Sequence, residues 1–128
     1  MRILLVEDEA DIREIYKELL GMEGYTVVEA SDGDEALTKA LAGDWDLLLL
    51  DIMLPKRDGL EVLSNIKSTP ELKSRPVVLL TNLDKDSILQ ACMQLGANNY
   101  LVKSNITPQE IVKEVAKYNP EPVAESDE

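Results

Sequence analysis

The chain has 128 residues, of which 45% are hydrophobic and 30% are charged, a balance that fits one soluble domain and excludes a disordered chain. Its 25 acidic and 13 basic residues give a formal net charge of −12, which argues against direct nucleic-acid binding. The apolar runs are too short to span a membrane, the N-terminus turns acidic too early for a secretory signal, and the single cysteine excludes an internal disulfide, so we expect a cytoplasmic protein without a membrane partner.

Five short apolar runs predict five β-strands. The first, third and fourth runs are apolar throughout, which is typical of strands that are covered on both faces of a parallel sheet. The gaps between the runs are long enough for helical crossovers between parallel strands. In chain order, the runs cover residues 3–6, 25–28, 47–50, 77–80 and 100–102.

Between the strands and after the last one, apolar residues recur at spacings of three and four and predict five helices. Ser31 or Asp32 can cap the second helix. The fifth has the strongest start signal, a capping box from Thr107 to Glu110 with Pro108 at the first helical position. The expected stops of the first four helices are, in order, Gly21 or Gly24, Gly43, the residues before Pro70, and Gly96.

The alternation of strands and helices predicts an open α/β sheet with right-handed crossovers. We expect residues 1–118 to form this domain. Residues 119–128 contain two prolines and four acids, and we expect them to be a tail or the stub of a linker.

Polar residues follow four of the predicted strands. Glu7 and Asp8 follow the first strand, Asp51 the third, Thr81 the fourth and Lys103 the fifth. Because parallel strands present their carboxyl ends to one edge, where ligands bind, we expect these side chains to converge there. Glu29 ends the second strand without a matching partner.

This set of side chains indicates phosphoryl chemistry at a metal site. Glu7, Asp8 and Asp51 would repel one another unless a cation offset their charge, and Mg²⁺ suits a few carboxylates with waters and a phosphate. Lys103 and Thr81 can bind phosphate oxygens, and Asp51 can act as a nucleophile toward phosphorus. The chain has no histidine, which excludes serine or cysteine triads and His/Cys zinc sites.

The chain resembles the response regulator receiver domains of two-component signalling, over nearly all of residues 1–118. The single motifs are weak, but their ordered set is highly specific. It comprises the pair Glu7-Asp8, the apolar strand that ends in Asp51, the segment Met53-Leu54-Pro55 with Asp58-Gly59, and then Thr81 and Lys103.

The resemblance implies a three-layer, flavodoxin-like α/β fold, with a five-stranded parallel sheet of order 2-1-3-4-5 and five helices. It implies that Asp51 is the phosphoacceptor. It further implies that Mg²⁺, or Mn²⁺ in its place, is bound by Asp8, Asp51 and the backbone carbonyl of Met53, with Glu7 acting through water. Such a domain is a signalling switch and not an enzyme.

The resemblance also implies a switch pair, Thr81 and Tyr100, and partners. The phosphodonor would be a phosphohistidine on a sensor histidine kinase or a phosphotransfer protein, and the missing histidine fits a donor on another chain. Output would pass through the surface of the fourth helix, fifth strand and fifth helix, to a separate protein partner or to an output domain that is missing here. The resemblance also allows a homodimer to form on phosphorylation.

Three features depart from the usual family pattern. Lys103 is followed by Ser104, where the family usually has a proline behind a cis bond, and Asn82 stands where a small residue is common. Met53 and Leu83 place apolar groups beside the site, where nothing would orient an attacking water. We therefore predict a long-lived aspartyl phosphate.

Other interpretations stay open. A scaffold with the same fold would not need phosphorylation. A metal-dependent phosphohydrolase would generally want a second acid two residues after its nucleophile, where this chain has Met53. Single residues also have structural interpretations: Glu7-Asp8 as helix-start acids, Asp51 as a turn residue, Thr81 as a helix cap, Lys103 as a solvated charge, and Tyr100 as a half-buried strand aromatic.

Overall fold

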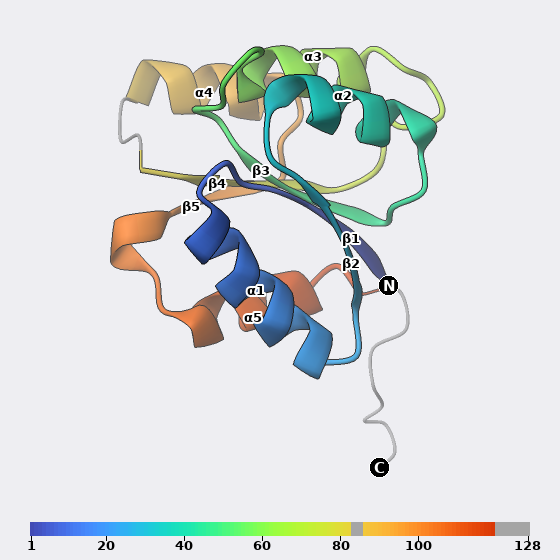
Figure 1. Ribbon diagram of the computed structural model, residues 1–128. Helices are drawn as coiled ribbons and strands as arrows, with labels where there is room; N and C mark the ends of the chain where they lie inside the picture. The colour runs from blue at the N-terminus through green and yellow to red at the C-terminus, as the bar shows by residue number, and fades with distance from the viewer. Residues whose placement is uncertain (83–85, 120–128) are drawn as a thin grey trace.

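The computed structural model describes residues 1–82 and 86–119. Five parallel strands form a sheet of order β2-β1-β3-β4-β5 (Figure 1). This topology confirms the flavodoxin-like fold. The strands are β1 Arg2–Val6, β2 Thr26–Ala30, β3 Leu47–Asp51, β4 Val77–Thr81 and β5 Asn99–Val102.

Helices cover both faces of the sheet, which gives the three layers that we predicted. Figure 1 shows α2, α3 and α4 on one face and α1 and α5 on the other. None of the helices in the described part of the chain is both long and apolar enough to span a membrane. The helices are α1 Ala10–Met22, α2 Gly33–Ala42, α3 Gly59–Lys67, α4 Asp86–Gln94 and α5 Pro108–Ala116, with a short 3₁₀ turn η1 at Lys103–Asn105.

The apolar strands divide their side chains between two cores. Leu48 and Leu50 of β3 pack in the core under α2, α3 and α4, whereas Leu47 and Leu49 pack in the core shared with α1 and α5. All four are fully buried. The unbroken apolar runs therefore mark strands that are covered on both faces, as expected.

The second strand differs from its prediction by one residue at its start and two at its end. It runs over Thr26–Ala30 and so includes the charged residue Glu29. A charge is tolerated there because β2 is an edge strand, and Glu29 forms ion pairs with Arg13 and Lys17 on α1. The pattern of apolar residues alone could not show these partners.

Most of the predicted helix signals act as expected. Of the two candidate caps for α2, Asp32 accepts the Glu35 N–H at 2.8 Å. The capping box of Thr107 and Glu110 forms at the start of α5. At the end of α1, the chain passes through Gly21 in helical form and turns at Gly24, whose φ of +92° favours glycine.

Two close backbone approaches position the loop after Asp51. A Cβ atom on Gly59 would lie 2.5 Å from the Asp51 carbonyl oxygen, and one on Gly33 would lie 1.8 Å from the Arg57 carbonyl oxygen. Only glycine fits at such distances. The β3–α3 loop is therefore held against the end of β3 and against the first turn of α2.

Candidate functional site

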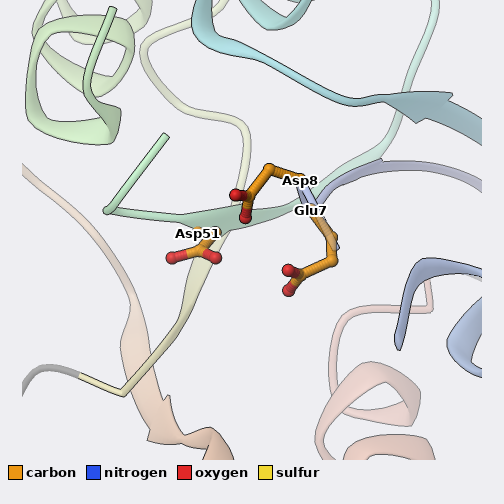
Figure 2. A group of neighbouring side chains, drawn as sticks. All are labelled: Glu7, Asp8 and Asp51. Carbon is orange, nitrogen blue, oxygen red and sulfur yellow. The ribbon is translucent and has the colours of Figure 1, made fainter. Parts of the chain in front are cut away.

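Three carboxylates lie together where β1 and β3 end. Glu7 and Asp8 directly follow β1, Asp51 is the last residue of β3, and these strands are neighbours in the sheet. One carboxylate oxygen from each residue lies within 4.8 Å of the others. Figure 2 shows the Asp8 side chain above that of Asp51, with the Glu7 carboxylate to the right of Asp51.

Lys103 brings a positive charge to these acids. Its Nζ donates to Glu7 Oε1 at 2.7 Å and to Asp51 Oδ2 at 3.0 Å, and its side chain is only 7% exposed. Lys103 follows β5, whereas the acids follow β1 and β3, so its side chain reaches across the end of the sheet. We call Glu7, Asp8, Asp51 and Lys103 the acid pocket.

The acid pocket holds more negative than positive charge. Burial raises the pKa of both Glu7 and Asp51, and the hydrogen bonds from Lys103 lower these values only in part. Burial lowers the pKa of Lys103, but its hydrogen bonds to Glu7 and Asp51 raise it above the usual value. Within residues 1–82 and 86–119, the three carboxylates of the pocket thus face a single ammonium.

The donor set fits a hard divalent cation. Asp8 is exposed, and it lines a cavity of about 190 Å³ together with Asp51 and Lys103. Oxygen ligands from a few carboxylates, with room for water, are what Mg²⁺ prefers. The N–H of Met53 donates to Asp51 Oδ1 at 3.0 Å. The proposed role of the Met53 carbonyl as a metal ligand stays a prediction.

The two residues of the predicted switch pair differ in exposure. Thr81 is the last residue of β4 and is fully buried, in register with Val102 of β5. Tyr100 is 39% exposed and lines an apolar cavity of about 310 Å³ with Leu89 and Met93 of α4. The ring of Tyr100 therefore lies at the surface between β5 and α4, and the switch role of the pair stays a prediction.

Comparison with known proteins decides the family. A model of the response regulator receiver domain matches residues 3–116. The chain belongs to this family. Receiver domains of response regulators are generally signalling proteins of two-component systems, so the resemblance found in the sequence is confirmed.

The chain is similar to transcriptional regulators that are longer than itself. It is 39% identical over 114 residues to the transcriptional regulatory protein ResD of Bacillus subtilis. The aligned residues cover 89% of this chain and 46% of ResD. It is 40% identical over 102 residues to CpxR of Escherichia coli. This alignment covers 80% of this chain and 42% of CpxR. The chain thus spans less than half the length of these curated relatives.

Solved receiver structures are also similar to this one. The response regulator TrrA of Thermotoga maritima, in complex with Mg²⁺ and beryllofluoride, is 38% identical with a TM-score of 0.80, covering 91% of this chain and 97% of that one. The chemotaxis protein CheY4 of Vibrio cholerae is 29% identical with a TM-score of 0.83, at the same coverage of both chains.

Two of the departures from the family pattern can be followed in this receiver domain. The described residues contain no cis peptide bond, so Lys103 and Ser104 are joined in trans, and Lys103 still contacts both Glu7 and Asp51. Asn82 is exposed and lines the same cavity as Asp51. Leu83 lies outside the described residues, as do residues 120–128 of the predicted tail.

Two further polar clusters were not predicted. Arg13 and Glu29 form an ion pair beside the acid pocket, and the only signal in the sequence was an acid without a partner at the end of a strand. Glu114 on α5 is 5% exposed and accepts hydrogen bonds from Asn99, Lys117 and Tyr118. The sequence feature that could have indicated this cluster is the position of Glu114, an acid three residues from Ile111 within the apolar stripe of the fifth helix.

Proposed function

We propose that this receiver domain accepts a phosphoryl group on Asp51, from a phosphohistidine on a sensor histidine kinase or a phosphotransfer protein. The observation that carries the proposal is the contact of Lys103 Nζ with Asp51 at 3.0 Å, in a pocket where Glu7 and Asp8 supply further carboxylate oxygens. In the transfer, the bond from phosphorus to the donor nitrogen breaks and a bond from phosphorus to an Asp51 carboxylate oxygen forms.

Each residue of the pocket has a distinct part in this step. Asp8 and Asp51 would hold Mg²⁺ with the Met53 carbonyl, and Glu7 would act through water. When bound, Mg²⁺ supplies positive charge to the oxygens of the transferring group. Lys103 neutralises one phosphoryl oxygen. The Met53 N–H fixes the orientation of the Asp51 carboxylate through Oδ1.

The output of the switch would be a change in the surface formed by α4, β5 and α5. Phosphorylation would draw the Thr81 hydroxyl to the new phosphoryl group, and the ring of Tyr100 would move inward from its exposed position between β5 and α4. This population shift requires that the phosphoryl group interact more strongly with one arrangement than with the other. The recipient would be a protein partner, an output domain in a longer chain, or a second copy in a homodimer.

The proposed phosphoaspartate would be long-lived. Met53 is 61% exposed and presents an apolar side chain at the mouth of the cavity beside Asp51, where it cannot orient an attacking water. This also favours a phosphoacceptor over a phosphohydrolase, since the position two residues after Asp51 carries no acid for proton transfer. Loss of the phosphoryl group within seconds in the purified chain would contradict this prediction.

The proposal is tested with small phosphodonors and intact mass. The chain is incubated with Mg²⁺ and phosphoramidate, whose P–N bond is that of a phosphohistidine, or with acetyl phosphate. We expect one phosphoryl adduct on the native chain and none on Asp51→Asn. Asp58→Asn is the matched control, because Asp58 is a nearby acid that caps α3 and asparagine caps equally well. An adduct on both Asp51→Asn and the native chain, or on neither, would overturn the proposal.

A further inference from the structure

Glu29, the strand-end acid without a predicted partner, ties an edge strand to a helix. Its Oε1 accepts a hydrogen bond from Arg13 Nε at 3.2 Å, and its Oε2 lies 2.9 Å from Lys17 Nζ. Arg13 and Lys17 are four residues apart on α1, so Glu29 of β2 lies against one face of this helix. The Arg13 side chain is the more buried of the two bases, with 20% exposed against 45% for Lys17.

Arg13 also reaches the backbone of the acid pocket. Its Nη1 donates to the carbonyl oxygen of Glu7 at 2.7 Å, while the N–H of Glu7 donates to the Ala30 carbonyl at 3.1 Å. The Glu7 carbonyl belongs to the peptide unit that leads into Asp8, and such units are planar. Holding this carbonyl therefore sets the direction in which Asp8 leaves β1.

We propose that Arg13, oriented by Glu29, is a positioning residue for the cation site. It holds the peptide between Glu7 and Asp8 so that the Asp8 carboxylate faces Asp51, as Figure 2 shows. The planar guanidinium can serve both the carbonyl and the Glu29 carboxylate at once, which a lysine ammonium cannot do with the same geometry. This inference rests on the proposed function, because it assumes that the acid pocket binds a divalent cation.

The sign of one mutational effect separates positioning from simple electrostatics. Arg13 is a cation near a site for a cation, so removal of its charge alone would strengthen metal binding. If Arg13 positions Asp8, its removal weakens metal binding instead. Arg13→Lys sharpens the test, because it keeps the charge and loses the forked geometry.

The experiment measures the Kd of Mn²⁺, by its enhancement of water proton relaxation, for the native chain and variants in their folded state. We expect Arg13→Gln to raise the Kd about tenfold, as loss of a residue that orients a metal ligand typically does. Arg13→Lys should raise it in the same direction. The matched control is Lys17→Gln, which removes the other partner of Glu29 and should leave the Kd within about twofold.

Several outcomes would overturn the inference. An unchanged or lower Kd for Arg13→Gln would show that Arg13 acts only through its charge or not at all. If Arg13→Gln fails to fold, an unchanged Kd for Arg13→Lys would overturn the inference equally. An equal rise in Kd for Lys17→Gln would show that general loosening of α1 is responsible. Absence of Mn²⁺ binding by the native chain would instead overturn the proposed function, and the inference with it.

Discussion

Two regions of the molecule bury carboxylates and treat their charge in opposite ways. In the acid pocket, Glu7 and Asp51 share one ammonium, that of Lys103. Burial raises the pKa of both acids, and the hydrogen bonds from Lys103 do not fully offset it. The folded chain therefore disfavours the charged form of these two side chains.

On α5, a single buried carboxylate is fully supplied with donors. Glu114 accepts hydrogen bonds from Asn99 Nδ2 at 2.9 Å, Lys117 Nζ at 3.0 Å and Tyr118 Oη at 2.9 Å. Burial raises its pKa, but the three hydrogen bonds together bring it below the usual value. We call these four residues the Glu114 cluster.

Glu7 and Asp51 each accept two hydrogen bonds, one from the shared Lys103 ammonium and one from a backbone N–H, whereas Glu114 accepts three. In the Glu114 cluster, three donors compensate the buried charge, and their hydrogen bonds join β5 to the end of α5. Among the described residues, Lys103 is the one cation in contact with Glu7 and Asp51, so negative charge exceeds positive charge in the acid pocket. The acid pocket therefore contributes less to the free energy of unfolding than an equally buried site with fully paired charges would.

The largest expected effect comes from removing the one ammonium of the acid pocket. Lys103→Met leaves two buried carboxylates without their partner and should lower the free energy of unfolding by about 3–5 kcal/mol at neutral pH. Urea denaturation measures this change. The matched variant in the other region is Lys117→Met, whose side chain is 65% exposed and which should lose less than about 1 kcal/mol. Equal losses in the two variants would break the comparison.

Neutral isosteres of the acids should change stability in opposite directions. Glu114→Gln removes the charge that three donors support and should lower the free energy of unfolding by about 2 kcal/mol. Asp51→Asn removes a charge that the folded state disfavours and should raise it, in the absence of divalent cations. Thermal and urea unfolding of both variants check the two signs. If both variants were destabilised alike, the excess of negative charge in the acid pocket would be refuted.

Added Mg²⁺ should stabilise only through the acid pocket. A ligand that binds the folded chain alone adds about 1.4 kcal/mol when its concentration is ten times its Kd. We expect this gain in the native chain and in Glu114→Gln, since that variant leaves the pocket intact. Asp51→Asn should lose most of it. A gain of the same size in Asp51→Asn would place the cation elsewhere.

The parallel α/β sheet and the acid pocket could be predicted from local patterns, whereas the strand order was implied by the resemblance to receiver domains. The unbroken apolar run before Asp51 marks a strand covered on both faces, and the parallel arrangement brings strand ends to one edge. Glu7, Asp8, Asp51 and Lys103 each lie at or directly after such an end, so their convergence follows from the topology.

The other clusters could not be predicted because they depend on how separate elements pack. Glu114 meets Asn99 only because α5 lies against β5, and the order of residues along the chain carries no sign of this pairing. Arg13 contacts the Glu7 carbonyl because α1 turns back beneath β1. Long polar side chains can reach partners in many directions, and only the packed structure selects one.

The last expected effect is a pH dependence that belongs to the Glu114 cluster. Burial, together with the hydrogen bond to Glu114, raises the pKa of Tyr118 to about 12. An unfolded tyrosine ionises near pH 10, so the folded chain holds this proton more tightly. The resulting stability is fully present below about pH 10 and is lost as the pH rises through about 12.

Tyr118→Phe removes this phenol, so the stabilities of native chain and variant should converge between pH 10 and 12, whatever other groups ionise there. Urea unfolding at several pH values follows the convergence, and near-ultraviolet absorbance follows the phenol itself. Glu114→Gln removes the negative charge beside Tyr118 and should move its midpoint down, towards pH 10. If the free energies of unfolding of the native chain and Tyr118→Phe instead stay parallel over this pH range, Glu114 does not raise the pKa of Tyr118. The cluster would then stabilise the fold by packing alone.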